Sequence, residues 1–302
     1  MRAHPILFVA SAVILIGGIG VAWVSWFGVR DGDDRQDARA LPSSDPSTAD
    51  GNGPTAGASG APAAETTGVQ DGVELRPTGS LTITQAGAVI DQLDVTGTVV
   101  VAAPDVTIRN TRITATSWMG VKIQSGSLLI EDSEIIGASD DCAQGIGWAN
   151  YVAVRIDVSG CQDGLKGNGS VAVYDSYIHD LRQTSDSHND GFQSTGGSDI
   201  TIEGNTICAQ HQDSVSAIKL TPEKGAIDNV VIRDNILRGG NFTLYMDSKP
   251  NRYGLVTNAL VENNTIAAGS YAHKWQNVDS DPTQRFTNNV EADVEICGLE
   301  TG

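Results

Sequence analysis

From residue 81 onward, apolar and polar residues alternate in short stretches that recur along the chain. Each copy places Val, Ile or Leu at every second position, then an Asn or Asp, then another apolar residue, which is typical of a half-buried strand followed by a turn. Clear copies lie at 106–113, 128–135, 171–178, 200–207, 230–237 and 260–266, with a looser copy at 152–157 and a last one at 285–290. Their centres are about 19 to 30 residues apart, so we predict one unit repeated by stacking.

A second short strand is predicted within each interval between these copies. These strands lie at 120–123, 145–148, 164–167, 191–194, 217–220, 243–246 and 272–275. If the second residue of each points inward, alternation sends the first and third residues outward. The first residues are Gly, Ala or Thr, and the third residues form a column of Lys122, Gly147, Lys166, Gln193, Lys219, Tyr245 and Lys274. The small residues would form the floor of a groove or merely relieve crowding. No interval has a helical pattern, so the sequence predicts all-β coils.

The Asn and Asp residues that follow the first kind of strand are predicted to stack at a corner of the coil. Both residue types tolerate a left-handed backbone and form local hydrogen bonds. We therefore interpret them as a ladder of turn residues rather than as ligands of a sugar or a metal.

The chain before the repeats has two segments of different composition. Residues 6–27 are almost entirely apolar and long enough to span a bilayer as one helix. The only A-x-A sequence, at 38–40, lies well beyond this segment, so we predict a retained membrane anchor over 1–30 with a short cytoplasmic tail rather than a cleaved signal. Residues 31–72, rich in Asp, Ser, Gly and Pro, predict a disordered linker. The repeats make one domain over 73–302.

Composition and charge narrow the class of partner. The 302 residues carry a formal net charge of −18, and no basic run is present, so we expect no nucleic-acid partner. Counts of Lys and Arg beside the anchor would place the repeat domain inside the cell. The linker, the cysteines and the type of fold favour the extracellular side instead. We expect a single-pass protein of the cell membrane with an extracellular domain, and a monomer.

The segment HNDGFQ at 188–193, together with the strand repeats, resembles a known family. Over residues 81–297 the chain is similar to right-handed parallel β-helix proteins of the pectate-lyase-like superfamily, in particular to secreted, actinobacterial-type members with an H-x-D-G-[FI]-Q segment. The resemblance implies an all-β, single-stranded right-handed parallel β-helix, which is a solenoid. It leaves the reaction open, because this fold carries lyases, hydrolases, epimerases and non-catalytic adhesins.

Two of the four cysteines occupy equivalent positions in consecutive coils. Cys142 and Cys161 each lie three residues before the glycine that opens the next short strand. Adjacent strands are about 4.8 Å apart, a separation that a disulfide tolerates. We predict a disulfide between them, with buried free thiols as the alternative. Cys208 and Cys297 lie several coils apart, and their pairing is left open.

Polar residues on neighbouring coils could carry out β-elimination on a uronic-acid polysaccharide. This reaction needs a base for the proton α to the carboxylate, donors or cations that hold the carboxylate, and an acid for the leaving oxygen. We predict Lys166 or Lys219 as the base, with the other lysine neutralising the carboxylate. His188 is an alternative base, because histidine side chains exchange protons near neutral pH. The predicted substrate-binding residues are Gln193, Tyr245, His211, Lys122 and Lys274.

Two aspartates and three tryptophans have two interpretations each. Asp163 and Asp190 could hold Ca²⁺, the cofactor that the resemblance implies, or cap the corners of the coils. Trp118, Trp148 and Trp275 could stack on sugar rings or pack at the rim of the coils.

Other function classes remain open. The main rival is a non-catalytic carbohydrate-binding or cell-envelope structural module, whose partner would also be a cell-envelope glycan. A glycoside hydrolase or an epimerase comes third, because hydrolysis needs carboxylates that converge on one bond and the candidate aspartates stand one per coil. Lys, His and Asp side chains packed together on three adjacent coils would favour an enzyme. Polar groups spread evenly around the coils would favour the module.

Overall fold

The computed structural model describes residues 60–184, 188–209, 216–248, 253–267 and 281–292, with the backbone of 275 and 276. All described residues belong to one unit, within Ala56–Gly302. The predicted membrane anchor, most of the predicted linker, His211, Lys274 and Cys297 lie outside the described residues, and what was expected of them stays a prediction. Within the described ranges, no helix is long and apolar enough to cross a bilayer.

The described residues form an all-β structure of two parallel sheets, as the alternation predicted. One sheet has ten strands: β1 (Arg76–Thr78), β4 (Leu93–Thr96), β6 (Arg112–Ala115), β8 (Glu134–Gly137), β11 (Asp157–Ser159), β14 (Tyr177–Ile178), β17 (Thr206–Ala209), β20 (Ile236–Gly239), β23 (Thr265–Ile266) and β26 (Val290–Glu291). The other sheet consists of two ladders that merge in its long strands, β5 (Val99–Arg109) and β7 (Met119–Glu131).

The two ladders of this second sheet are named here by their order along the chain. The first ladder contains β2 (Leu81–Ile83), β9 (Gln144–Gly147), β12 (Asp163–Lys166), β15 (Asp190–Ser194), β18 (Ser216–Leu220), β21 (Leu244–Met246) and β24 (Trp275–Gln276). The second ladder contains β3 (Val89–Asp91), β10 (Tyr151–Val154), β13 (Val171–Tyr174), β16 (Gly197–Glu203), β19 (Ile227–Arg233), β22 (Val256–Glu262) and β25 (Arg285–Thr287).

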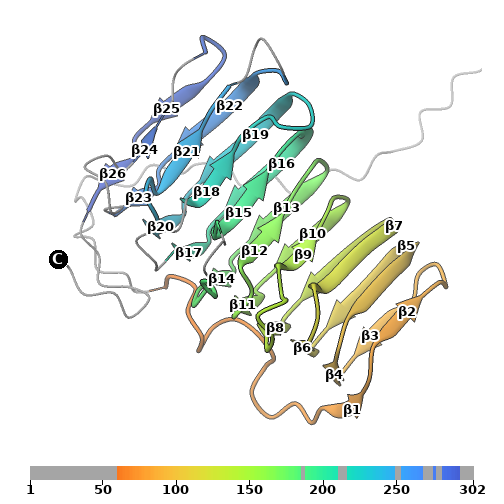
Figure 1. The fold of residues 1–302 in the computed structure, drawn as a ribbon. Coiled ribbons are helices and arrows are strands. Elements are labelled where there is room, and N and C mark those ends of the chain that lie inside the picture. Colours follow the sequence, from red (N-terminus) through yellow and green to blue (C-terminus); the bar gives the residue numbers. More distant parts are fainter. Residues whose placement is uncertain are drawn as a thin grey trace, which may run out of the picture. The chain divides into compact units, whose positions relative to one another are not determined.

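Each coil of the chain passes through the first ladder, the second ladder and the ten-stranded sheet in turn. For example, β12, β13 and β14 make one coil, and each pairs in parallel with its counterpart in the next coil, β15, β16 and β17. Figure 1 shows the strands as consecutive layers that run from β1 in orange to β25 in blue. This arrangement is compatible with a parallel β-helix.

Apolar side chains from all three sets of strands fill one continuous core. In the second ladder the inward column includes Ile108, Ile130, Val173, Ile202 and Ile232, and all five are fully buried. Removing such side chains from water contributes about 25 cal/mol for each Å² of apolar surface. The repeated inward Val, Ile and Leu therefore supply the main force that stacks the coils.

The sequence pattern predicted that one Asn or Asp at each turn would both adopt a left-handed backbone and form the stacked hydrogen bonds. At the corner between the second ladder and the ten-stranded sheet, two adjacent residues divide these two tasks. The first adopts a left-handed backbone, as Asp234 and Asn263 do, each with φ of 57°. The second is a buried amide in a ladder: Asn205 Nδ2 donates to Asn235 Oδ1 at 3.0 Å, and Asn235 Nδ2 donates to Asn264 Oδ1 at 2.9 Å. The predicted turn ladder is confirmed.

The register of the first ladder confirms most of the predicted outward column. Lys166 pairs with Gln193, Gln193 with Lys219, and Lys219 with Tyr245. These four side chains therefore occupy the same position in consecutive coils.

The last predicted copy of the short strand, at 272–275, is wrong in register. Trp275 lies opposite Leu244, and Gln276 lies opposite Tyr245. The column position that the sequence assigned to Lys274 therefore belongs to Gln276. A shift of two residues keeps the same alternation of inward and outward positions, so the pattern alone did not reveal it.

The predicted disulfide between Cys142 and Cys161 is present, with 4.8 Å between the two Cα atoms. It joins the segments that precede β9 and β12, in consecutive coils. Cys208 is disulfide-bonded as well, and no described cysteine is free. The alternative of buried free thiols at 142 and 161 is therefore excluded.

The described structure begins inside the segment predicted as a linker. Thr67 N donates to Ala63 O at 3.1 Å, and Gly68 N donates to Arg155 O at 2.9 Å. Thr67 and Gly68 are buried, so these residues pack on the corner that precedes β11. The chain then returns to β1, at the first coil.

Candidate functional site

The first ladder departs from strict alternation at the start of its strands. In β12, Asp163 Oδ2 and Lys166 Nζ form an ion pair of 2.8 Å although the residues are three positions apart. The two residues between them face the core. Leu165 is fully buried, and a Cβ on Gly164 would lie 2.5 Å from Ile178 Cγ2 of the ten-stranded sheet. The first and fourth residues of the strand therefore lie together on the outer face.

The glycines predicted to form the floor of a groove are buried instead. A Cβ on Gly145 would lie 2.8 Å from Val158 Cγ1 and 2.6 Å from the carbonyl oxygen of Gly164. Gly120 and Gly191 are crowded in the same way by an isoleucine of the ten-stranded sheet and by the backbone of the next coil. The groove-floor interpretation is wrong, because it assumed strict alternation. The alternative, that small residues relieve crowding, is confirmed.

Five side chains of β12, β15 and β18 form one connected network. Lys166 Nζ contacts Asp163 Oδ2 at 2.8 Å and donates to Gln193 Oε1 at 2.7 Å. Gln193 Nε2 donates to Asp190 Oδ2 at 2.6 Å, and Lys219 Nζ lies 3.8 Å from that oxygen. Asp190 N donates to Asp163 Oδ1 at 2.9 Å. Residues that the sequence proposed as base, substrate ligand and metal ligand thus meet on three adjacent coils, and we call them the lysine–aspartate cluster.

Burial sets the protonation of the two carboxyl groups in the cluster. Asp190 is fully buried. This burial, reinforced by the charge of Asp163, raises the pKa of Asp190 to about 8, against the opposing influence of Lys219 and Gln193. Burial also raises the pKa of Asp163, and Lys166 opposes that shift. At neutral pH Asp190 is therefore mostly protonated, and the two lysines give the cluster an excess of positive charge.

The lysines are the members of the cluster that solvent reaches. The side chain of Lys166 is 21% exposed and that of Lys219 is 15% exposed. Asp163, Asp190 and Gln193 are buried. A ligand that arrives from solvent would therefore meet the two ammonium groups, with the carboxyl groups behind them.

Sequence reasoning missed two polar residues that extend the cluster along its column. Gln144 lies opposite Asp163, and Ser216 lies opposite Asp190. Gln144 and Ser216 are buried. Among the described residues, no hydrogen-bond partner is present for Gln144 Nε2, Gln144 Oε1, Ser216 Oγ or Asp190 Oδ1. Buried polar groups are usually hydrogen-bonded, so this column has unused bonding capacity. The sequence did contain a signal for this column, because four consecutive strands of the first ladder, β9, β12, β15 and β18, each begin with a polar residue.

The other predicted residues lie outside the cluster. His188 is exposed, just before β15. Tyr245 continues the column, and its hydroxyl donates to Asp247 Oδ2 at 3.1 Å. Lys122 is half-buried and lies opposite Gly147, further toward the first coil. The structure thus concentrates the predicted chemistry at the two lysines and their immediate partners.

The donor set of the cluster is a poor match for calcium, which takes about six to eight oxygen ligands. Of the carboxyl oxygens of Asp163 and Asp190, only Asp190 Oδ1 has no partner in the described structure. An ammonium group lies within 4 Å of Asp163 Oδ2 and another within 4 Å of Asp190 Oδ2, and both would repel a cation. Within the described ranges no group of three or more His, Cys, Asp or Glu side chains could hold a metal. Calcium binding stays a prediction.

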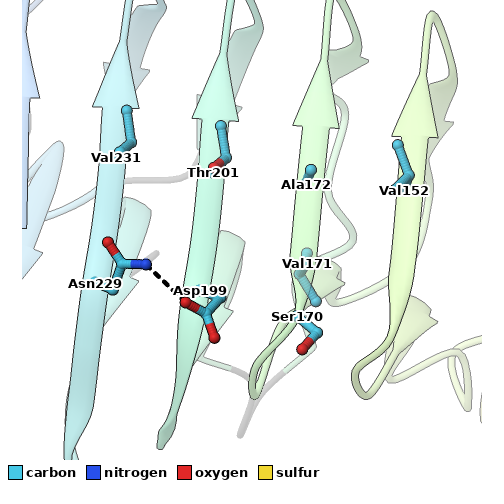
Figure 2. A pocket seen from close by; sticks show the side chains of 8 residues that line it. All are labelled: Val152, Ser170, Val171, Ala172, Asp199, Thr201, Asn229 and Val231. Atoms are coloured by element: carbon cyan, nitrogen blue, oxygen red, sulfur yellow. Dashed lines mark hydrogen bonds between the residues drawn. The ribbon is translucent and has the colours of Figure 1, made fainter. Parts of the chain in front are cut away.

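A separate hollow lies on the outer face of the second ladder, where Figure 2 shows its side chains on four neighbouring strands. It is lined by Val152, Ser170, Val171, Ala172, Asp199, Thr201, Asn229 and Val231. Asn229 Nδ2 donates to Asp199 Oδ1 at 2.6 Å. Asp199 is the only ionisable group of this lining, so the hollow offers no pair of groups for acid–base chemistry.

Comparison of the chain with protein-family models, with curated proteins and with solved structures found no match. The resemblance to the pectate-lyase-like superfamily therefore stays a prediction.

Proposed function

We propose that this protein is a right-handed parallel β-helix of the pectate-lyase-like type that binds a uronic-acid polysaccharide at the first ladder and cleaves it by β-elimination. The observation that carries the proposal is the lysine–aspartate cluster. Two partly exposed lysines and two buried aspartates are joined through Gln193 on three adjacent coils. This concentration of acid–base groups favours an enzyme over a module with evenly spread polar residues.

The charge of the cluster supports an anionic substrate. Burial raises the pKa of Asp190 to about 8, so near neutral pH Asp163 is the main carboxylate beside Lys166 and Lys219. The protein as a whole carries a formal charge of −18, which would repel a polyanion elsewhere on its surface. Excess positive charge at the cluster would direct a uronate carboxylate to this place.

The contacts of the two lysines suggest a division of roles. Lys166 Nζ has two close partners, at 2.7 and 2.8 Å, so we assign it to hold the substrate carboxylate. Lys219 Nζ is 3.8 Å from its nearest acidic oxygen and is less tightly held. We assign Lys219 as the base that removes the proton α to the carboxylate, a role that requires its neutral form. As the double bond forms, the carbon–oxygen bond to the leaving sugar breaks, and Lys219, now an ammonium group, returns the proton to that oxygen.

Extracytoplasmic placement forms part of the proposal. The disulfide between Cys142 and Cys161 supports it, because disulfides persist in oxidising compartments. A membrane anchor over residues 1–30 would tether the domain to the outer surface of the cell membrane.

The test is a screen of the full-length chain against polygalacturonate, alginate and glycosaminoglycans, with and without Ca²⁺. Elimination is followed by the ultraviolet absorbance of the unsaturated uronate that it produces. Lys219→Ala should lower kcat by at least about 100-fold, the usual share of a general base. Lys166→Ala should mainly raise KM. Arg285→Ala, which removes an exposed charge from the second ladder, should change neither.

The same screen separates the other candidate functions. Two buried carboxyl groups on adjacent coils, both with pKa values raised by burial, also suit a glycoside hydrolase, which would release reducing ends without the unsaturated product. An epimerase would leave the polymer length unchanged and alter its sugar composition. If the chain is retained on a glycan but causes no chemical change, the protein is a carbohydrate-binding module, and the enzyme hypothesis is rejected.

A further inference from the structure

Two tryptophans from consecutive coils meet beside the first ladder. Trp118 directly precedes β7, and Trp148 directly follows β9. Their ring centroids are 5.7 Å apart, and the ring planes are inclined by 52°. Trp118 is 50% exposed, so the pair meets on the solvent side. A half-exposed indole offers a large apolar surface and a polar N–H to a ligand.

A positive charge lies over the Trp148 ring of this pair. Lys224 Nζ is 5.0 Å from the centroid of the Trp148 ring, and Lys224 is an exposed residue. It belongs to the turn after β18, where its N–H donates to Thr195 O at 2.8 Å. A cation–π contact at an exposed site is weak, so the ammonium group remains available to an anion.

The register of the first ladder places the tryptophan pair next to the lysine–aspartate cluster. Ile146 lies opposite Leu165, so Gly147 holds in its coil the position that Lys166 holds in the next. A Cβ on Gly147 would meet nothing closer than 3.6 Å, and Trp148 follows it directly. Adjacent strands are about 4.8 Å apart. Trp148 therefore lies one coil from Lys166, and Trp118 lies two coils from it.

We propose that Trp118, Trp148 and Lys224 form a subsite for one acidic sugar unit, adjacent to the unit whose carboxylate Lys166 holds and whose α proton Lys219 removes. The apolar face of the sugar ring would stack on Trp118, and its carboxylate would pair with Lys224. This inference rests on the proposed function, because it assigns a neighbouring uronate of the same polymer. The polymer would then run along the stack of coils, and the subsite would set its position over the lysines.

Calorimetric titration of the full-length chain with a galacturonate hexamer tests the subsite without relying on cleavage. The parent carries Lys219→Ala so that the hexamer stays intact. Adding Trp118→Ala or Lys224→Gln should weaken binding about five- to tenfold, whereas Arg285→Gln should leave it unchanged. With a neutral cellulose hexamer, any affinity should fall with Trp118→Ala and not with Lys224→Gln, because only the acidic sugar uses the ammonium group.

The outcomes distinguish the subsite from the reaction. Unchanged affinity in both variants, or a parent that does not bind the hexamer, would overturn the subsite even if the unsubstituted chain cleaves polygalacturonate. If both variants bind more weakly but the unsubstituted chain never produces the unsaturated uronate, the subsite proposal stands and the proposed elimination reaction is rejected. If Trp118→Ala prevents folding, the exposed Lys224→Gln variant decides the question alone.

Discussion

The carboxyl group of Asp190 lies in an environment very different from water. It is fully buried beside Asp163, Gln193 and Lys219, and its pKa rises from an ordinary value of 3.8 to about 8. In the folded protein it therefore keeps a proton at a pH where the unfolded chain has lost it. A proton retained in the folded state makes stability depend on pH.

Asp190→Asn should flatten the dependence of folding stability on pH. Between about pH 4 and 8 the folded state binds one proton that the unfolded state does not, so the stabilisation present at low pH is lost as pH rises through this window. For one group the loss is on the order of 2 kcal/mol between pH 5 and 7. Urea unfolding at pH 5, 6, 7 and 8 should show this decline in the unsubstituted chain and a smaller one in the variant.

The control for this experiment is Asp141→Asn, which alters an exposed carboxylate in a turn. It should keep the full decline of stability with pH. Equal slopes in the unsubstituted chain and in Asp190→Asn would contradict a buried, protonated Asp190.

Among the elements, the first ladder and the ten-stranded sheet are in close contact at the buried column of glycines. Gly145 is the clearest case, because an added Cβ would lie 2.8 Å from Val158 Cγ1 and 2.6 Å from a carbonyl oxygen. A backbone carbonyl in a paired strand cannot move aside easily. The spacing between these two sets of strands thus depends on residues that lack a side chain.

Gly145→Ala should destabilise the fold by about 1–3 kcal/mol, because the methyl group overpacks a closed interface. Gly79→Ala is the matched control, since a Cβ there would meet nothing within 4 Å. Urea denaturation of both variants measures the difference. Similar midpoints for the two variants would show that the coils can separate to accept the methyl group.

The asparagine ladder, at the corner between the second ladder and the ten-stranded sheet, joins consecutive coils through buried amides. Asn235→Ala should cost about 2–4 kcal/mol, because it removes the acceptor for Asn205 N and leaves buried polar groups unpaired. Asn289→Ala, at a half-buried position, should cost less because water can replace the lost bonds. Thermal unfolding of both variants gives the order, and a larger loss for Asn289→Ala would contradict the ladder's role.

At the scale of the repeat domain, the segment before β1 links coils that are far apart in the stack. Gly68 N donates to Arg155 O near β11, whereas Arg76 pairs with Leu93 in the first coils. A chain that starts at Gly60 should therefore be more stable than one that starts at Asp71, by about 1–2 kcal/mol for one buried hydrogen bond and its packing. Equal urea midpoints for the two chains would show that this segment adds nothing.

Much of the architecture was readable in the amino-acid pattern. Each coil buries the same face as its neighbours, so the inward Val, Ile and Leu repeat visibly, and the corner Asn residues repeat with them. The pairing of Cys142 with Cys161 followed from the same repeat, because equivalent positions in adjacent coils lie one strand spacing apart. Local periodicity and the stacking that it requires were enough for these features.

Contacts between coils were beyond the reach of the pattern. The alternation rule placed Gly164 outward, whereas the packing of Ile178 turns it inward and brings Asp163 beside Lys166. The register at Gln276 depends on the number of residues between β23 and β24, and a pattern that repeats every two residues does not determine that number. The raised pKa of Asp190 and the contact of Lys224 with Trp148 likewise arise from residues distant in the chain. Burial and proximity between coils exist only once the chain has folded, so they had to come from the three-dimensional structure.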